Sequence, residues 1–326
     1  MTPVELSRTV LRAVRRAVDA GELDVSVPER VLVTVPGPGG CGDYATNVAL
    51  QLARPAGQPP LRVAEVLRTY LVGADGVGDV VVTGPGFLNI SLRGDAAPVA
   101  ALVREIRERG ASYGHGDALA GEVVVLRVPY DVRAEVVADA LGRIIASQGG
   151  RVEVGHEEPV NLRPVPAPED PAPLGADAER WALLHPALHD RPRITADHLV
   201  QREGNPLFRV RYAHARTRAV TRNADRLGFT ATPGEVGDVE YGVLVGVLTD
   251  HPRVLTAAAH RRAPDRLARH LVTVADAALP FLLTVLPQGE EKPSAAHRAR
   301  LALAEAAGTV LAGGLSLLGI DAPDHL

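Results

Sequence analysis

Two side chains that can bind a nucleobase stand two residues apart in residues 87–92 (FLNISL), a segment with the pattern of a strand. Successive side chains of a strand point to opposite faces, so the three apolar residues must face the core, and Phe87 and Asn89 lie together on the polar face. A stacking ring and a hydrogen-bonding carboxamide are the groups that recognise single-stranded RNA loops, and one stack can contribute roughly 1–3 kcal/mol. The alternative is structural: Phe87 covers the edge of the sheet and Asn89 satisfies a turn.

A second candidate is an arginine cluster between residues 202 and 226, where seven arginines and two acidic residues give a local charge of +5. Helical spacing places Arg209, Tyr212 and Arg216 along one stripe. Guanidinium groups on both sides of a tyrosine suit a bent phosphate backbone with an unstacked base, as in an anticodon loop. The alternative is a solvated basic face in a chain whose positive charge is almost all arginine. His214 is expected to hydrogen-bond within the folded domain rather than to contact RNA.

The elements that must position these groups follow from the periodicity of the apolar residues. Helices are predicted from about residue 3 to 20, 61 to 72 and 98 to 109, with a hairpin over residues 80–92 that turns at the Gly-Pro-Gly sequence. We therefore expect residues 1–118 to form an α+β domain of helices packed on an antiparallel sheet.

The following segment, residues 119–157, has a strand pattern at each end and an amphipathic helix pattern between them. This order is typical of the opening of a Rossmann-like nucleotide-binding fold. Residues 158–174 are rich in proline and are expected to be an extended linker. Residues 175–326 are expected to form an all-α helical bundle.

The composition of the chain limits which ligands and metal sites it can have. A net charge of -4 and a pI near 6.3 argue against indiscriminate nucleic-acid coating, so only local basic faces can bind RNA. Cys41 is the sole cysteine, which excludes disulfides and thiolate metal clusters. His185 and His189 have a metal-binding spacing, but Pro186 intervenes and no third ligand is close in the sequence. We expect no metal and no cofactor.

The apolar residues predict core helices rather than membrane spans. Residues 271–286 are the most apolar late stretch, but Asp276 and Pro280 interrupt it. The first residues have a helical pattern with several arginines and lack the apolar core of a signal peptide. We therefore expect a cytoplasmic protein with no membrane partner.

Short motifs at both ends of the chain resemble the arginyl-tRNA synthetase family. Near the N-terminus these are GDYATN at 42–47 and VTGPGFLNI at 82–90; near the C-terminus they are GADAERW at 175–181, NPLFRVRYAHAR at 205–216 and LLGIDAP at 317–323. The resemblance implies an N-terminal domain that contacts the D-loop at the outer corner of tRNA, and a DALR domain that binds the anticodon. The residues to which it gives a tRNA-binding role are Phe87, Asn89, Asn205, Arg209, Tyr212 and Arg216.

The catalytic signatures of that family are absent from the sequence. Class I synthetases surround the ATP phosphates with His-Ile-Gly-His at a strand-to-helix turn and with a Lys-Met-Ser-Lys-Ser loop. No two histidines here have the His-x-x-His spacing, and Lys292 is the only lysine. Residues 119–157 resemble the elements that flank the first signature, which makes them a remnant of the catalytic fold. We therefore expect no catalytic residues and no enzyme activity, although the family's activity would be that of an arginine–tRNA ligase.

The main hypothesis is a tRNA-binding, catalytically degenerate paralogue of arginyl-tRNA synthetase, a pseudoenzyme that acts in trans or as a regulator. One alternative is ATP-dependent arginine–tRNA ligase-related activity that depends on a partner. The other is a protein-interaction scaffold. The expected partners are tRNA, with arginine tRNA as the first candidate, and a full-length synthetase or another tRNA-using enzyme.

Overall fold

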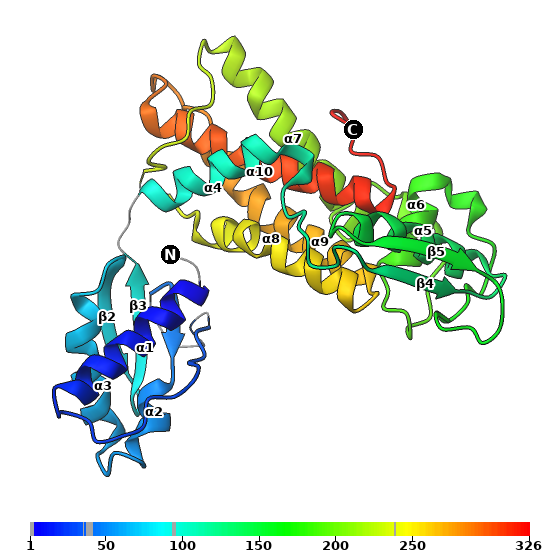
Figure 1. Ribbon diagram of the computed structural model, residues 1–326. Helices are drawn as coiled ribbons and strands as arrows, with labels where there is room; N and C mark the ends of the chain where they lie inside the picture. The colour runs from blue at the N-terminus through cyan, green and yellow to red at the C-terminus, as the bar shows by residue number, and fades with distance from the viewer. Residues whose placement is uncertain (1–2, 35, 37–41, 93–95, 238) are drawn as a thin grey trace. The chain divides into compact units, whose positions relative to one another are not determined.

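The computed structural model describes residues 3–326 except 35, 37–41, 93–95 and 238, and it divides into two compact units, Met1–Pro98 and Val99–Leu326 (Figure 1). Each unit has its own hydrophobic core. The division lies twenty residues before the expected boundary at residue 118. The reason is that Val103 and Ile106, on the helix α4 (Ala96–Arg109), are buried in the core of the second unit.

The first unit combines helices with a three-stranded antiparallel sheet, as the sequence predicts. The strand order is β1-β3-β2, so β3 is the central strand. Helix α1 buries Leu6, Val10 and Val14, and α3 buries Leu67 and Leu71, in one core. The elements are α1 (Pro3–Asp19), β1 (Tyr44–Thr46), α2 (Val48–Ala53), α3 (Pro60–Val72), β2 (Val77–Thr83) and β3 (Phe87–Leu92).

The second unit begins with α4 and continues into a strand–helix–strand segment. Strands β4 (Val123–Arg127) and β5 (Arg151–Gly155) pair in parallel, and α5 (Val132–Ala146) connects them. Asp131 caps α5, because its Oδ1 accepts a hydrogen bond from the backbone N of Ala134 at 3.1 Å. The expected element order is confirmed, but two strands do not by themselves define a Rossmann fold.

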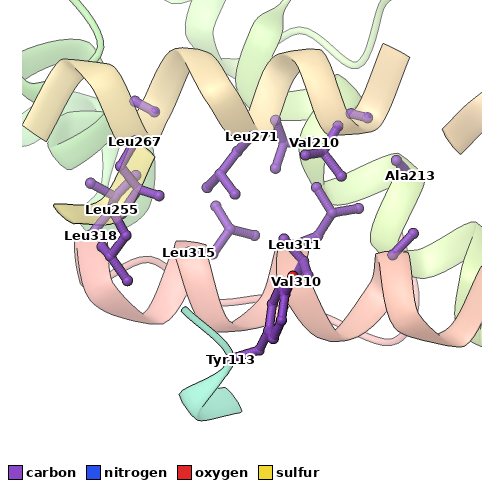
Figure 2. Packing of buried hydrophobic residues seen from close by; sticks show 14 of the residues in the cluster. Tyr113, Val210, Ala213, Leu255, Leu267, Leu271, Val310, Leu311, Leu315 and Leu318 are labelled. Carbon is purple, nitrogen blue, oxygen red and sulfur yellow. The ribbon is translucent and has the colours of Figure 1, made fainter. Parts of the chain in front are cut away.

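The remainder of the second unit is the predicted helical bundle. In Figure 2, Leu271 of α9 lies beside Leu311 and Leu315 of α10. A side chain at Gly314 of α10 would overlap Leu271, so glycine permits the close approach of the two helices. The helices are α6 (Ala176–Leu184), α7 (Pro206–Arg226), α8 (Gly242–His260), α9 (Pro264–Phe281) and α10 (Ala295–Leu318).

Two segments, residues 264–284 and 295–318, are long and apolar enough to cross a membrane by length and composition. In the fold, however, 56% of the first apolar window and 67% of the second are buried. Leu271, Leu311 and Leu315 have no exposed surface. We interpret both segments as core helices of the bundle.

The proline-rich segment is packed onto the second unit and is not a free linker. Asn161 binds the edge of β4: its Oδ1 accepts from the backbone N of Arg127 at 2.8 Å, and its Nδ2 donates to the carbonyl of Val125 at 2.9 Å. Further along, the backbone N of Val165 donates to the carbonyl of Leu188 at 2.8 Å. The segment therefore has a fixed path between the strands and the bundle.

A buried arginine holds this path in place. Arg133, in the first turn of α5, has no exposed surface, and burial lowers its pKa. Its guanidinium fork satisfies all its hydrogen-bond donors with backbone carbonyls, so no carboxylate is needed in contact. The acceptors are Leu183 (3.0 Å), Val165 (2.7 Å), Asp190 (2.7 Å), Pro186 (3.1 Å) and Ala187 (2.9 Å).

Two histidines are buried side by side in the same unit. The ring of His251 on α8 stacks on Tyr113 at 5.9 Å between centroids and lies 5.3 Å from the ring of His270 on α9. Burial lowers the pKa of His251 to about 3 and that of His270 to about 4. Both rings are therefore neutral at pH 7, and protonation of either ring would cost stability.

Candidate nucleic-acid interface

Phe87 is presented at the end of the β2–β3 hairpin in the first unit. It pairs with Thr83 across the turn, and 41% of its surface is exposed. The turn requires glycine at Gly86, whose φ is +132° and where an added Cβ would meet the backbone of Pro60 at 3.0 Å. An exposed ring on a rigid hairpin is suited to stacking on a base. The tRNA-binding role of Phe87 stays a prediction.

Asn89 is not presented beside it, contrary to the sequence expectation. Its side chain is 2% exposed, and its Nδ2 donates to Thr83 Oγ1 at 2.6 Å and to the carbonyl of Val81 at 3.4 Å. In the register of the sheet, Asn89 lies between Ala45 of β1 and Val81 of β2. The amide group therefore pins β3 to β2, and a base edge cannot reach it in this conformation.

The motif at residues 42–47 has a structural function in the first unit. Asp43 Oδ2 accepts from the backbone N of Leu92 at 2.8 Å, and Thr46 Oγ1 accepts from the backbone N of Val48 at 3.3 Å. Gly42 has a φ of +79°, and an added Cβ would lie 2.9 Å from the carbonyl oxygen of Ile90. These residues join β1 to the end of β3 and begin α2.

Asn205, the first candidate of the second unit, is the N-cap of α7 and is 5% exposed. Its Oδ1 accepts from the backbone N of Leu207 at 3.1 Å and of Phe208 at 3.4 Å. Its Nδ2 donates to the carbonyls of His198 at 2.8 Å and Val200 at 3.0 Å. The side chain is thus committed to starting the helix, which explains the Asn-Pro sequence without RNA.

Tyr212 stands on the exposed side of α7 with a partner that the sequence argument missed. Its ring stacks on Phe208 at 5.4 Å between centroids and 19° between planes, and 38% of Tyr212 is exposed. Arg216 follows one turn later, and its side chain has no hydrogen bond or ion pair within the part of the chain that the structure describes. The i, i+4 spacing of the two aromatic residues was the available signal. Together Phe208 and Tyr212 form a platform, and beside it lies the guanidinium of Arg216, which is unpaired within the described residues.

Most of the arginines around this platform are already paired, so the local charge of +5 overstates what an RNA would meet. Arg209 binds Asp276 of α9, so an RNA phosphate would have to compete with this aspartate for the guanidinium. The paired acids come from distant segments of the chain, which a local count cannot include. The pairs are Arg202–Asp197, Arg209–Asp276, Arg211–Asp177 and Arg218–Asp324.

The motif at 175–181 also acts as an internal anchor. Asp177 binds Arg211 of α7, and its Oδ1 accepts from the backbone N of Asp321 at 3.3 Å. Arg180 binds Asp139 of α5 and donates to the carbonyl of Leu318 at 3.1 Å. The motif therefore joins α5, α6, α7 and the C-terminal segment.

The three histidines considered in the sequence do not form a site. The ring of His185 is stacked on Trp181 at 5.2 Å, and burial lowers its pKa to about 4, whereas the side chain of His189 is 86% exposed. His214 is 5% exposed, and its Nδ1 lies 3.1 Å from the carbonyl of Pro323, within the bundle as the sequence suggested.

Comparison with known proteins finds two matching domain families, one at each end of the chain. Residues 5–92 match the family of arginyl tRNA synthetase N terminal domains, and residues 210–326 match the family of DALR anticodon binding domains. Both ends of the chain are therefore similar to domains of arginyl-tRNA synthetases.

Similar proteins are named arginine–tRNA ligases. That of Frankia alni is 26% identical over 557 residues, an alignment that spans 100% of both chains. That of Renibacterium salmoninarum is 41% identical over 165 residues, which are 47% of this chain and 30% of the relative. Because the first alignment covers 557 residues and this chain has 326, at least 231 of its positions have no residue here.

Solved structures agree on the fold. The arginyl-tRNA synthetase of Thermus thermophilus has a TM-score of 0.65 at 15% identity over 100% of both chains. That of Plasmodium falciparum has a TM-score of 0.66 at 9% identity over 99% of both chains.

These comparisons correct the expectation that the chain is not an enzyme. The Frankia alni relative that aligns from end to end is named an arginine–tRNA ligase, and the likeness does not stop at the two terminal domains. The expectation rested on two missing signatures, which are local features, whereas the similarity extends along the whole chain. The pseudoenzyme interpretation that followed from it is not supported either.

Proposed function

We propose that this protein acts in the ATP-dependent arginylation of tRNA, as an arginine–tRNA ligase-related protein that binds tRNA and depends on a partner chain for activation of the amino acid. The observation that carries the proposal is the end-to-end similarity to an arginine–tRNA ligase. The matches at both ends of the chain to an arginyl tRNA synthetase N terminal domain and a DALR anticodon binding domain support it.

Two surface features support binding of an RNA with unstacked bases. One is the exposed ring of Phe87 at the hairpin end in the first unit. The other is the platform of Phe208 and Tyr212 with the unpaired Arg216 beside it in the second unit. Aromatic faces with a guanidinium nearby are suited to loop bases and the phosphates next to them. The ligand proposed for both is tRNA, with arginine tRNA as the first candidate.

The dependence on a partner follows from what the chain lacks. At least 231 positions of the alignment with the Frankia alni ligase have no residue here, and Lys292 is the only lysine. We infer that β4, α5 and β5 correspond to the start of a class I catalytic fold. Their parallel pairing supports this assignment. Stabilisation of the developing phosphate charge would come from the partner.

The test is a tRNA arginylation assay with ATP and radiolabelled arginine, in which a full-length arginine–tRNA ligase is limiting. Adding this chain should raise the initial rate at subsaturating tRNA. Tyr212→Ala should abolish the increase and Tyr212→Phe should preserve it, because only the ring is needed for stacking. The absence of both a rate increase and tRNA binding would refute the proposal.

Exchange of pyrophosphate into ATP, measured with arginine and this chain alone, tests the partner clause separately. The expected result is no exchange without the full-length ligase. Exchange by the isolated chain would overturn the dependence on a partner and would leave the arginylation function intact.

A further inference from the structure

The arginines of α1 form a second positively charged surface, on the first unit, which the sequence argument did not consider. Arg8, Arg12 and Arg15 are all exposed. With 3.6 residues per turn they lie within about 60° of one another around the helix. The core face, which carries Leu6 and Val10, lies on the opposite side.

Among the residues that the structure describes, no ion pair neutralises Arg8, Arg12 or Arg15. Within the described residues, none of these three arginines has an acidic partner, and the hydrogen bond of Arg12 is to Thr9 Oγ1 at 3.0 Å. On α7, by contrast, Arg209, Arg211 and Arg218 are each bound to an aspartate. In the described part of the chain, half of the arginines of α7 are thus neutralised by ion pairs, whereas Arg8, Arg12 and Arg15 of α1 are not.

The concentration is local and does not reflect the charge of the whole unit. Residues 1–98 contain nine arginines and ten acidic residues, so the unit is slightly acidic overall. Four of the nine arginines fall between residues 8 and 16. Glu5, Arg8, Leu11, Arg12 and Arg15 line a shallow hollow on this side of the helix. An acidic domain that concentrates its free positive charge in one row has the electrostatic pattern of an anion-binding surface.

We propose that Arg8, Arg12 and Arg15 bind the phosphodiester backbone of structured RNA, which deepens the proposed function and rests on its assumption that tRNA is bound. At 1.5 Å per residue, the row from Arg8 to Arg15 is about 10 Å long. One strand of a B-form duplex carries a phosphate about every 3.4 Å along its axis, and the spacing in an A-form RNA duplex is shorter, so at least about three phosphates match the row. Such contacts supply affinity and orientation, while base recognition remains with Phe87.

The experiment is a salt titration of labelled tRNA binding, followed by fluorescence anisotropy. The triple variant Arg8→Gln, Arg12→Gln and Arg15→Gln should lower the slope of log affinity against log salt by about 2 to 3, since each lost phosphate contact contributes about 0.9. Affinity at low salt should fall by about tenfold or more. The triple lysine variant should keep the slope of the wild-type protein, because it keeps the charge.

The matched control neutralises three exposed arginines of the second unit that have no ion pair within the described chain: Arg104→Gln, Arg191→Gln and Arg261→Gln. Net charge changes by the same amount, but the slope should change by less than about 1. Circular dichroism should show equal helix content in both variants, because glutamine and arginine have similar helix propensities.

The outcomes separate this inference from the proposed function. If the α1 variant binds tRNA with an unchanged salt slope, or with a slope change no larger than that of the control, the assignment of RNA binding to α1 is wrong and the proposed function stands. If the wild-type protein binds no tRNA, both fail. A parallel measurement uses vesicles of phosphatidylserine and phosphatidylcholine. Binding of vesicles that needs the α1 arginines, with tRNA binding unaffected, would assign the surface to a membrane and overturn the RNA proposal.

Discussion

Replacing Arg133 by methionine should destabilise the second unit by about 3–5 kcal/mol. Hydrogen bonds to a charged group contribute about 1.5–3 kcal/mol each, so the five bonds of the guanidinium amount to about 7–15 kcal/mol. Burying the charge costs several kcal/mol, which the methionine variant recovers. A net loss of about 3–5 kcal/mol remains, because the methionine variant leaves five buried carbonyls without a donor.

Urea unfolding followed by tryptophan fluorescence measures this directly. Trp181 is the only tryptophan, is fully buried, and lies on α6 close to the carbonyls that Arg133 binds, so it reports on the second unit. Arg133→Lys should lose most of the same stability, because one ammonium group with three donors cannot reach five carbonyls. The control is Arg151→Met, whose side chain is 73% exposed and which should change stability by less than about 1 kcal/mol.

A variant Arg133→Met that unfolds within about 1 kcal/mol of the wild-type protein would refute the argument. It would mean that the five carbonyls find water or other donors once the arginine is gone. Equal losses for Arg133→Met and Arg151→Met would have the same meaning, since burial would then make no difference.

Three further predictions concern pH and the RNA surface. The pKa values of His251 (about 3) and His270 (about 4) in the folded state lie below the unfolded value of about 6.5, so the unfolded state takes up protons first as the pH falls. The free energy of unfolding should therefore fall by about 2 kcal/mol per histidine between pH 7 and pH 5, as measured by urea unfolding at the two pH values. Equal stability at both pH values would contradict this. Tyr212→Ala should weaken binding of an anticodon stem-loop by about 1–3 kcal/mol in a titration in which Tyr212→Phe is unchanged. Phe87→Ala should weaken tRNA binding without changing the thermal stability of the first unit, whereas Asn89→Ala should lower that stability by about 1–3 kcal/mol; the reverse pattern would show that the two roles are exchanged.

The helices and the hairpin could be predicted because their signals are local. The periodicity of apolar residues located α1, α3 and α5 within a few residues, and the Gly-Pro-Gly sequence located the turn before Phe87. The two faces of β3 were not equally predictable. Alternation identifies the core face, but only the folded structure shows that Asn89, on the other face, is buried and hydrogen-bonded to Thr83 and Val81 of β2.

The charge on α7 could not be predicted from its own sequence for a related reason. The acids that bind Arg209, Arg211 and Arg218 are Asp276, Asp177 and Asp324, which lie between 34 and 106 residues away in the chain. A count of nearby charges includes none of them. The proline-rich segment was misjudged for the same reason, because its composition indicates a free linker. Hydrogen bonds donated by Arg133 and Asn161 hold it against the second unit, and these contacts are not visible in the local sequence.

The residues that carry the resemblance are mostly the ones that the fold itself needs. Asp43, Asn89, Asn205 and Asp177 each bind backbone or side-chain groups inside their own unit. Their presence therefore explains why the chain folds like an arginyl-tRNA synthetase, and it gives no information on RNA binding. The proposed RNA contacts are therefore expected from exposed groups and not from these four side chains. Free charge on α1 and exposed aromatic rings on α7 and the hairpin are such groups, and they can change without unfolding the protein, so differences in RNA preference between relatives should be sought there.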